Sequence, residues 1–334
     1  MGGIGFTFSL NNRFSPGFVL LWSMAQAKAG LHSRNQHRNG YDFEVLSESA
    51  PALQHYLVQN KRGQTSINFH DAAAVKCLNQ ALLLHHYKLD YWDIPHPYLC
   101  PAVPGRADYL HHLADLMAQE NGGRWPKGRK IRCLDIGTGA NLVYPIIGTY
   151  EYGWSFVGTD IDDKAIETAR TIWKKNARLQ QTTELRLQTK RAQLLQGIIT
   201  KEDYFDLVMC NPPFYSSAEE AQKENRRKKR GLKAAKGINR NFAGQAKELW
   251  CPGGEKAFIS QLIQESYSFP SSCYWFTSLV AREAHLKALL KQLEQVKATA
   301  IKIIPMAQGN KVSRILAWSF LNDKQKKAWR GARW

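Results

Sequence analysis

The chain has 334 residues, 44% of them hydrophobic, which is enough for a large core and long for one small domain. Its 46 Lys and Arg against 28 Asp and Glu leave a formal net charge of +18, which indicates a polyanionic partner such as nucleic acid. No apolar run approaches the roughly 18 residues of a membrane span. The six cysteines form no Cys-x-x-Cys pair, so we expect a cytoplasmic protein with reduced thiols and no metal site.

The N-terminal quarter of the chain begins with a segment, residues 1–27, to which no function is assigned. We expect it to be disordered, or to be an annotation extension ahead of a true start at Met24. Residues 28–44 are polar and basic without a helical or strand period. Two interpretations stay open for them, a solvated arm and a segment that becomes ordered on RNA.

Residues 71–87 have apolar side chains at helical spacing and begin with Asp71, a suitable cap, which predicts a helix. A run dense in proline and aromatic residues follows at 91–106 and predicts a stiff extended loop. Arg106 ends that loop and heads a predicted helix at 107–119. An arginine held in this way suits a carboxylate ligand, and the alternative is an arginine that faces solvent. We take 28–122 together as a basic, helical region that binds RNA and covers a cofactor.

An alternation of strands and helices starts at residue 131, which predicts a parallel sheet within a domain spanning 123–322. Strand 131–136 leads through the glycine-rich turn at Gly137 and Gly139 into a helix at 142–149. Strand 154–159 ends at Asp160, near the spacing at which a carboxylate binds ribose hydroxyls. The turn lacks a third glycine and Asp135 precedes it, which favours S-adenosyl-L-methionine (SAM) over a dinucleotide. A helix at 162–175 and a strand at 184–188 continue the series.

The next apolar run, 205–210, predicts a buried strand that ends at Asn211-Pro212-Pro213-Phe214. Proline ends the strand, so the exit loop leaves at the sheet edge where ligands bind in open α/β folds. Asn211 and the Pro212 carbonyl offer two hydrogen-bond acceptors, and Phe214 offers a flat face. These groups suit a planar substrate with an exocyclic amine, such as adenine. The alternative is an ordinary loop after a strand.

The stretch 223–247 holds ten Lys and Arg against the single acid Glu224. A segment so basic beside a catalytic candidate favours polyanion binding, and the alternative is a solubilising loop. The residues predicted to bind RNA are Arg226, Arg227, Lys228, Lys229, Arg230, Lys233, Lys236 and Arg240. The remaining pattern predicts a helix at 255–268, a strand at 272–279, a helix at 285–296 and an antiparallel pair at 298–304 and 315–320. A basic tail with two tryptophans, 323–334, either contacts RNA or covers the surface.

Four stretches together resemble the RlmF family of bacterial 23S ribosomal RNA adenine-N6 methyltransferases, related to the human U6 RNA methyltransferase. They are 100–112 (CPAVPGRADYLHH), 134–141 (LDIGTGAN), 210–214 (CNPPF) and 275–282 (WFTSLVAR). The resemblance spans about residues 29–330. It implies an α/β class I SAM-dependent methyltransferase with a Rossmann-like sheet and an N-terminal helical extension, with adenine 1618 of 23S RNA as target.

The resemblance also implies roles for single residues. The catalytic group would be Asn211, Pro212, Pro213 and Phe214. The cofactor would be held by Arg106 at its methionine carboxylate, by Asp160 at its ribose, and by Asp135, Gly137, Thr138, Gly139 and Ile161. The partner would be 23S ribosomal RNA or a precursor of the large ribosomal subunit, acted on by a monomer. Two other functions stay open: N5 methylation of a protein glutamine, and a non-catalytic RNA-binding factor in ribosome assembly.

Overall fold

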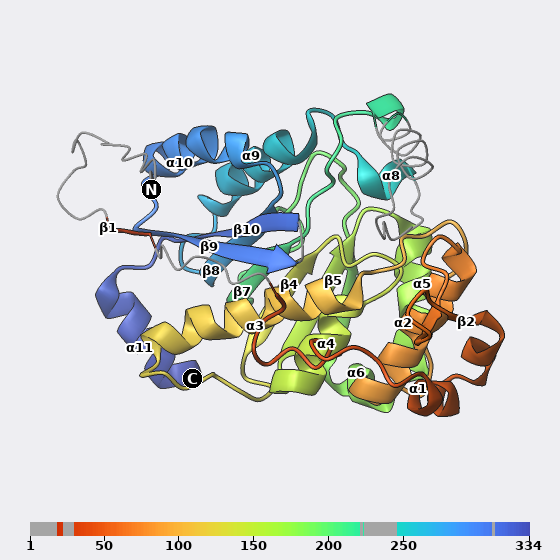
Figure 1. The fold of residues 1–334 in the computed structure, drawn as a ribbon. Coiled ribbons are helices and arrows are strands. Elements are labelled where there is room, and N and C mark those ends of the chain that lie inside the picture. The colour runs from red at the N-terminus through yellow and green to blue at the C-terminus, as the bar shows by residue number, and fades with distance from the viewer. Residues whose placement is uncertain (1–18, 23–29, 221–222, 224–245, 309–310) are drawn as a thin grey trace, which may run out of the picture.

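The computed structural model describes residues 19–22, 30–220, 223, 246–308 and 311–334. Their centre is an eight-stranded sheet in the order β1-β9-β10-β8-β7-β4-β5-β6 (Figure 1). Strands β4 to β8 run parallel, as the alternating pattern predicted. β10 is antiparallel to both of its neighbours, which confirms the predicted final pair. The strands of this sheet are β1 (Val19–Trp22), β4 (Arg132–Ile136), β5 (Ser155–Asp160), β6 (Thr183–Leu187), β7 (Phe205–Cys210), β8 (Cys273–Val280), β9 (Ala300–Gln308) and β10 (Lys311–Ser319).

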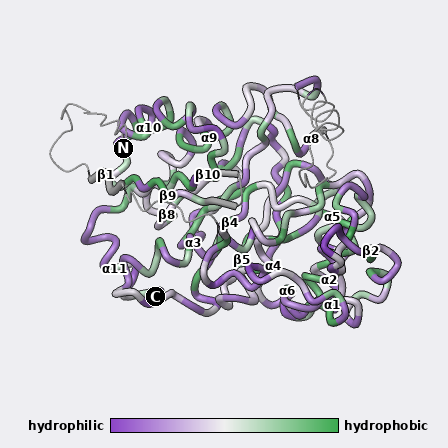
Figure 2. The backbone as a smooth tube through the Cα atoms, viewed as in Figure 1, coloured by the Kyte–Doolittle hydropathy of each residue, from purple (hydrophilic) through white to green (hydrophobic). Residues whose placement is uncertain are grey.

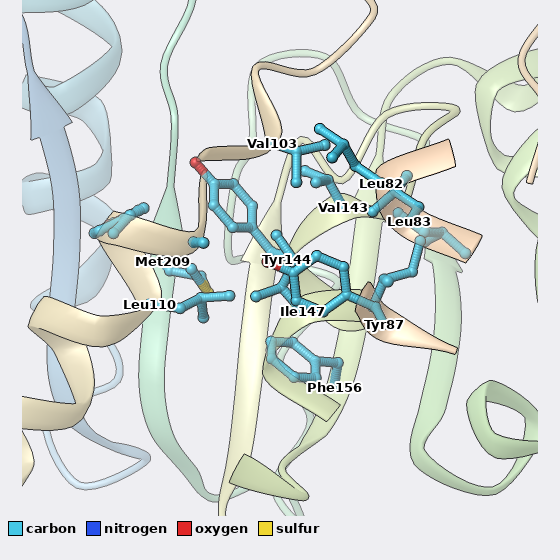
Figure 3. Packing of buried hydrophobic residues seen from close by; sticks show 14 of the residues in the cluster. Leu82, Leu83, Tyr87, Val103, Leu110, Val143, Tyr144, Ile147, Phe156 and Met209 are labelled. Atoms are coloured by element: carbon cyan, nitrogen blue, oxygen red, sulfur yellow. The ribbon is translucent and has the colours of Figure 1, made fainter. Parts of the chain in front are cut away.

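Helices cover both faces of the sheet because alternate residues of each strand point to opposite sides. In β7, Leu207 and Met209 belong to the apolar cluster under α2, α3 and α4, whereas Val208 and Cys210 belong to the one under α9 and α10. Figure 3 shows the first cluster, where Leu82, Leu83 and Tyr87 of α2 lie beside Val143 and Ile147 of α4. The helices are α1 (Phe43–Ser49), α2 (Ala72–Tyr87), α3 (Val103–Glu120), α4 (Val143–Tyr152), α5 (Asp163–Lys174), α6 (Ala177–Thr182), α8 (Ala246–Leu249), α9 (Gly254–Ser266), α10 (Leu286–Gln295) and α11 (Asp323–Arg333).

Several helix boundaries follow from local chemistry. Asp71 caps α2 by accepting from the backbone of Ala73 and Ala74, as predicted. The start of α3 differs from the prediction, because the helix begins at Val103 and not at 107. Pro104 is tolerated there since the first turn of a helix needs no N–H from it. Arg106 therefore lies inside the first turn of α3.

Residues 30–37, within the basic stretch 28–44, are bound to α3 and are not a solvated arm. The backbone of His32 and the amide of Asn35 both donate to Asp108 of α3, and Arg34 pairs with Asp115 at 2.8 Å. Asn35 and His37 are buried. Because α3 already binds His32, Arg34 and Asn35, residues 30–37 do not need RNA to become ordered.

Within the N-terminal extension 1–27, Val19–Trp22 pair with β9 in parallel register. The rest of that extension lies outside the described residues. A small separate hairpin, β2 (Leu57–Gln59) and β3 (Thr65–Ile67), follows α1 and a 3₁₀ turn at Pro51–Tyr56. No helix in the described part of the chain has the length and apolar character needed to cross a membrane.

The basic tail is a helix that packs on the protein. Figure 2 shows α11 as a mainly hydrophilic segment, yet several of its cations are paired internally. Lys326 lies 3.2 Å from Glu120, and Arg333 lies 2.8 Å from the buried carboxylate of Asp206. These charges of the tail therefore stabilise the fold and are not left free for an RNA surface.

Candidate active site

The candidate site lies where three parallel strands end. The chain runs outward from β4 through β5 to β6 and then returns to β7 on the other side of β4. This reversal of strand order leaves a crevice at the carboxyl ends of β4 and β7, the usual ligand site of such folds. Gly137 follows β4, Ile161 follows β5, and Asn211 follows β7. The structure therefore brings the predicted cofactor and catalytic segments to the same edge.

The turn after β4 depends on its two glycines. Gly137 and Gly139 have φ of 73° and 63°, a conformation that other residues adopt at a cost. The backbone N–H of Gly139 donates to Asp160 at 3.0 Å, which joins the turn to the end of β5. Space beside Gly137 is open, since a β-carbon there would meet nothing within 4 Å. A ligand can thus approach the backbone closely.

Buried polar atoms without a hydrogen-bond partner concentrate at this crevice. Nine such side-chain atoms occur among the described residues, and five of them belong to the ends of β4, β5 and β7 or the turn after β4. They are both carboxylate oxygens of Asp135, the hydroxyls of Thr138 and Thr159, and Oδ1 of Asn211. Buried polar groups are nearly always paired, so this concentration indicates a polar ligand. The residues present fit SAM, which carries an amino acid, a ribose and an adenine.

Two carboxylates at the crevice have raised pKa values. Burial raises the pKa of Asp135 to about 7. The nearby Thr138 hydroxyl lowers this pKa, and the charges of Asp160 and Arg106 have smaller effects, the first raising it and the second lowering it. Burial likewise raises the pKa of Asp160, although hydrogen bonds from the backbone of Asp162 and Gly139 lower it. Perturbed carboxylates in a crevice are a frequent sign of a functional site.

The proline-rich loop 91–102 covers the glycine turn. Trp92 Nε1 donates to the backbone of Asn141 at 2.9 Å, and Glu248 of α8 accepts from the backbone of Leu99 at 2.9 Å. Arg106 donates to the hydroxyl of Tyr144 at 3.2 Å. Arg106 thus lies beside α4, a position compatible with the predicted contact to the methionine carboxylate of the cofactor.

Sequence reasoning did not identify Glu248 or Tyr98 as parts of this site. Tyr98 is buried, and its pKa is raised by that burial and then by the charges of Asp162 and Glu248. Glu248 follows the basic segment, where nothing local distinguishes it from a solvated glutamate. For Tyr98, the one indication in the sequence was its place within the proline-rich run 91–106.

The acceptor side of the crevice is formed by the exit from β7. The loop after Phe214 is held by residues 249–254, since the backbone of Tyr215 bonds to Leu249 at 3.0 Å and to Cys251 at 3.1 Å. Gly254 allows close packing, because a β-carbon there would lie 3.2 Å from the backbone of Tyr215 and Ser216. The stretches that flank the basic segment, 215–216 and 249–254, therefore meet directly after Asn211-Pro-Pro-Phe214.

The residues predicted to bind RNA, Arg226, Arg227, Lys228, Lys229, Arg230, Lys233, Lys236 and Arg240, lie outside the described residues. In the part of the chain that the structure describes, no cluster of three or more His, Cys, Asp or Glu is arranged to hold a metal ion. All six cysteines are free thiols, in agreement with the sequence. Ile161, the last predicted cofactor residue, is half exposed immediately after Asp160.

Comparison with known proteins identifies the family of the chain. A family model described as RNA methyltransferase matches residues 24–322. Ribosomal RNA large subunit methyltransferase F of Photobacterium profundum is 49% identical over 327 residues, covering 92% of this chain and 97% of the relative. The protein of the same name from a Marinomonas species is 48% identical over 311 residues, covering 92% and 95%.

Solved structures of human METTL16 share the fold. The hMettl16 catalytic domain in complex with MAT2A 3'UTR hairpin 1 superposes with a TM-score of 0.75 at 28% identity, over 88% of this chain and 96% of that one. The N-terminal domain of human METTL16 in complex with SAH gives a TM-score of 0.68 at 26% identity, over 87% and 99%. The chain therefore belongs to the RNA methyltransferase family that includes ribosomal RNA large subunit methyltransferase F, and SAM is its methyl donor.

Proposed function

We propose that this SAM-dependent ribosomal RNA methyltransferase modifies N6 of an adenine, and that the adenine is number 1618 of 23S ribosomal RNA. The RNA class rests on family membership and on the names of the curated relatives. The atom that is modified rests on the chemistry at the end of β7. The position in the RNA rests on the resemblance of the four motifs to the RlmF family.

One observation carries the choice of an amine, namely the unpartnered Oδ1 of Asn211. This oxygen is buried at the sheet edge and accepts no hydrogen bond from the described protein. An acceptor in such a position costs free energy unless a ligand donates to it. The 6-amino group of adenine is a donor of the right kind, and a carbonyl oxygen of a base is not.

The residues after β7 would then act together on the base. Asn211 Oδ1 accepts one N6 hydrogen and the Pro212 carbonyl accepts the other, which favours a pyramidal nitrogen whose lone pair is free to attack. Phe214 stacks on the base after it leaves its helix, and Pro213 holds the turn in shape. The N6–carbon bond would form as the sulfonium–methyl bond breaks, with its electron pair left on sulfur as a neutral thioether. The proton would then be lost from N6 to water, so the site needs no strong general base.

The cofactor supplies, when bound, a methyl group activated by its sulfonium. We assign Arg106 to its carboxylate, Asp160 to its ribose hydroxyls, and the open backbone at Gly137, Thr138 and Gly139 to close contact with it. We also assign Asp135, near the end of β4, and Ile161, after β5, to the cofactor site. This assignment is supported by the unpartnered oxygens of Asp135 and the open space at Gly137.

The basic segment is assigned to the RNA strand, with Arg226 to Arg230 and Lys233, Lys236 and Arg240 as phosphate contacts. Support comes from its charge and from the backbone hydrogen bonds that join Tyr215, before the segment, to Leu249 and Cys251, after it. We further propose that the enzyme acts as a cytoplasmic monomer on 23S RNA or on a precursor of the large subunit. One chain contributes every residue invoked above.

Mapping of N6-methyladenine tests the proposal directly. Ribosomal RNA from cells with and without the gene is digested, and methylated positions are identified by mass spectrometry. We expect one N6-methyladenine, at 1618 of 23S RNA, to disappear with the gene and to return with a plasmid copy. Loss of a different methylated base, or methyl transfer from tritiated SAM into protein glutamine instead of RNA, would overturn the assignment.

A further inference from the structure

The loop after β8 contains Arg282, whose backbone is held in place by hydrogen bonds. Glu255 of α9 is buried and accepts from the backbone of Ala281 at 2.6 Å and of Arg282 at 3.2 Å. The same carboxylate accepts from Nδ1 of His285 at 2.8 Å. These bonds hold the backbone at residue 282, whereas the arginine side chain is 54% exposed. A charged group that is fixed at its base and open at its tip is suited to binding a ligand.

Arg282 reaches across to the loop after β7. Its Nη2 lies 3.1 Å from Oε1 of Glu220. The other oxygen of Glu220 accepts from the backbone of Ser216 at 2.8 Å and from the hydroxyl of that serine. Since Ser216 directly follows Tyr215, the ion pair bridges the exit loops of two neighbouring strands.

This bridge lies on the acceptor side of the crevice. β8 pairs with β7 on the side away from β4, whose glycine turn belongs to the cofactor. A nucleotide whose base reaches Asn211 carries a phosphate on each side of its sugar. The exit loops of β7 and β8 would border that nucleotide, so a phosphate of the bound strand would compete with the carboxylate of Glu220 for the same guanidinium.

We propose that Arg282 binds a backbone phosphate next to the target nucleotide, and that Glu220 holds this arginine only while RNA is absent. RNA entry exchanges the carboxylate for the phosphate, and the inference rests on the function proposed above. The exchange is inexpensive because ion pairs between exposed side chains contribute little. Arginine forms two parallel hydrogen bonds to phosphate, which an exposed pair with one short contact does not match.

Glu220 remains ionised after it is released. Hydrogen bonds from Ser216 lower its pKa to about 2, and Arg282 contributes less to that shift. The carboxylate thus remains bound to Ser216 when the arginine turns to RNA. It also repels phosphate while unpaired, so its removal makes RNA binding tighter.

The test compares RNA affinity of single and double variants by filter binding at several salt concentrations. The probe is a 23S RNA transcript that contains the methylated position. We expect Arg282→Ala to weaken binding about tenfold and to reduce the salt slope by roughly one phosphate contact, about 0.7. We expect Glu220→Gln, which retains an acceptor for Ser216, to strengthen binding about threefold. Added to Arg282→Ala, Glu220→Gln should have a smaller effect.

Glu184→Gln is the matched control. Glu184 pairs with Arg132 and Arg186 at the start of β6, at the opposite edge of the sheet, and its removal changes the net charge equally. The RNA affinity of Glu184→Gln should equal that of the wild type. SAM affinity should be unchanged in every variant, which would show that each variant is folded.

An ion pair with a purely structural role predicts losses for both Arg282→Ala and Glu220→Gln, and that result would overturn the inference. An equal gain from Glu184→Gln would also overturn it, because net charge would then explain the effect. If the wild type methylates 23S RNA and Arg282→Ala binds RNA with wild-type affinity, the proposed exchange at Arg282 is wrong but the proposed function stands. If the wild type methylates no RNA, the proposed function itself fails.

Discussion

The indole Nε1 of Trp334 donates a 2.7 Å hydrogen bond to Oδ1 of Asp206, although 128 residues separate them in the chain. The same carboxylate is fully buried and also accepts from Trp329 Nε1 at 2.7 Å and from Arg333 Nη2 at 2.8 Å. Asp206 belongs to β7, the strand that leads to Asn211. The last helix is therefore fastened to the strand that carries the proposed catalytic group.

Asp206→Ala should lower the free energy of unfolding by about 3 kcal/mol, because removing one partner of a buried ion pair leaves its donors unsatisfied. Urea denaturation measures the change. Lys324→Ala on the exposed side of α11 is the control and should stay within about 0.5 kcal/mol of the wild type. Equal stabilities for the two variants would show that α11 is not held by Asp206.

Asn211→Ala should reduce the turnover number for RNA methylation by about 10² to 10³-fold, the usual cost of losing one positioned hydrogen-bonding group in a catalytic site. SAM affinity should be unchanged, because the residue lies on the acceptor side. Single-turnover transfer of tritiated methyl and equilibrium dialysis measure the two quantities. Asn121→Ala, which removes an exposed amide at the end of α3, serves as the control. A rate within about twofold of the wild type would remove Asn211 from the mechanism.

Gly137→Ala and Gly123→Ala form a matched pair. Both glycines have positive φ, 73° and 79°, and open space at the position of a β-carbon. Both variants should therefore lose about 1 kcal/mol of stability from backbone strain. Only Gly137→Ala should weaken SAM binding, by more than about tenfold, since its methyl group enters the cofactor space. Similar SAM affinities in calorimetric titrations would argue against that contact.

The pKa of Asp135 gives a pH dependence with a defined sign. Burial raises its pKa from 3.8 to about 7, so the folded protein keeps a proton that the unfolded chain loses. The free energy of unfolding therefore falls as the pH rises from about 4 to 7, by up to roughly 4 kcal/mol from this group.

Asp135→Asn removes that contribution. Its stability relative to the wild type should increase between pH 5 and pH 7.5, as measured by urea denaturation without cofactor. A difference that is constant over this interval would mean that the carboxyl group is already ionised at pH 5 in the folded state.

The sequence was sufficient for the parallel strands β4 to β8 and their ends, but it did not predict β1. The run 205–210 is apolar because both faces of β7 are covered, and proline stops it at a definite residue, so Asn211 could be located without coordinates. Gly137, Gly139 and Asp160 were found in the same way, because positive φ and a strand end are local properties. The predicted RNA contacts between 226 and 240 are not tested by the described residues.

Ion pairs and hydrogen bonds between residues far apart in the chain could not be predicted from the sequence. Residues 30–37 and the tail 323–334 both look like basic surface in the sequence, yet Asp108 and Asp115 bind the first and Asp206 and Glu120 bind the second. A cation looks the same in a sequence whether water or a carboxylate surrounds it.

Local patterns of apolar residues, glycines and prolines thus determined the succession of strands and helices, the cofactor turn and the acceptor loop of this protein. Only the tertiary structure decided which charges are paired with buried carboxylates and which, such as that of Arg282, are paired at an exposed position beside the crevice. The physical reason is that hydrophobic periodicity depends on residues close together in the sequence. An ion pair depends on which distant residues the fold brings together.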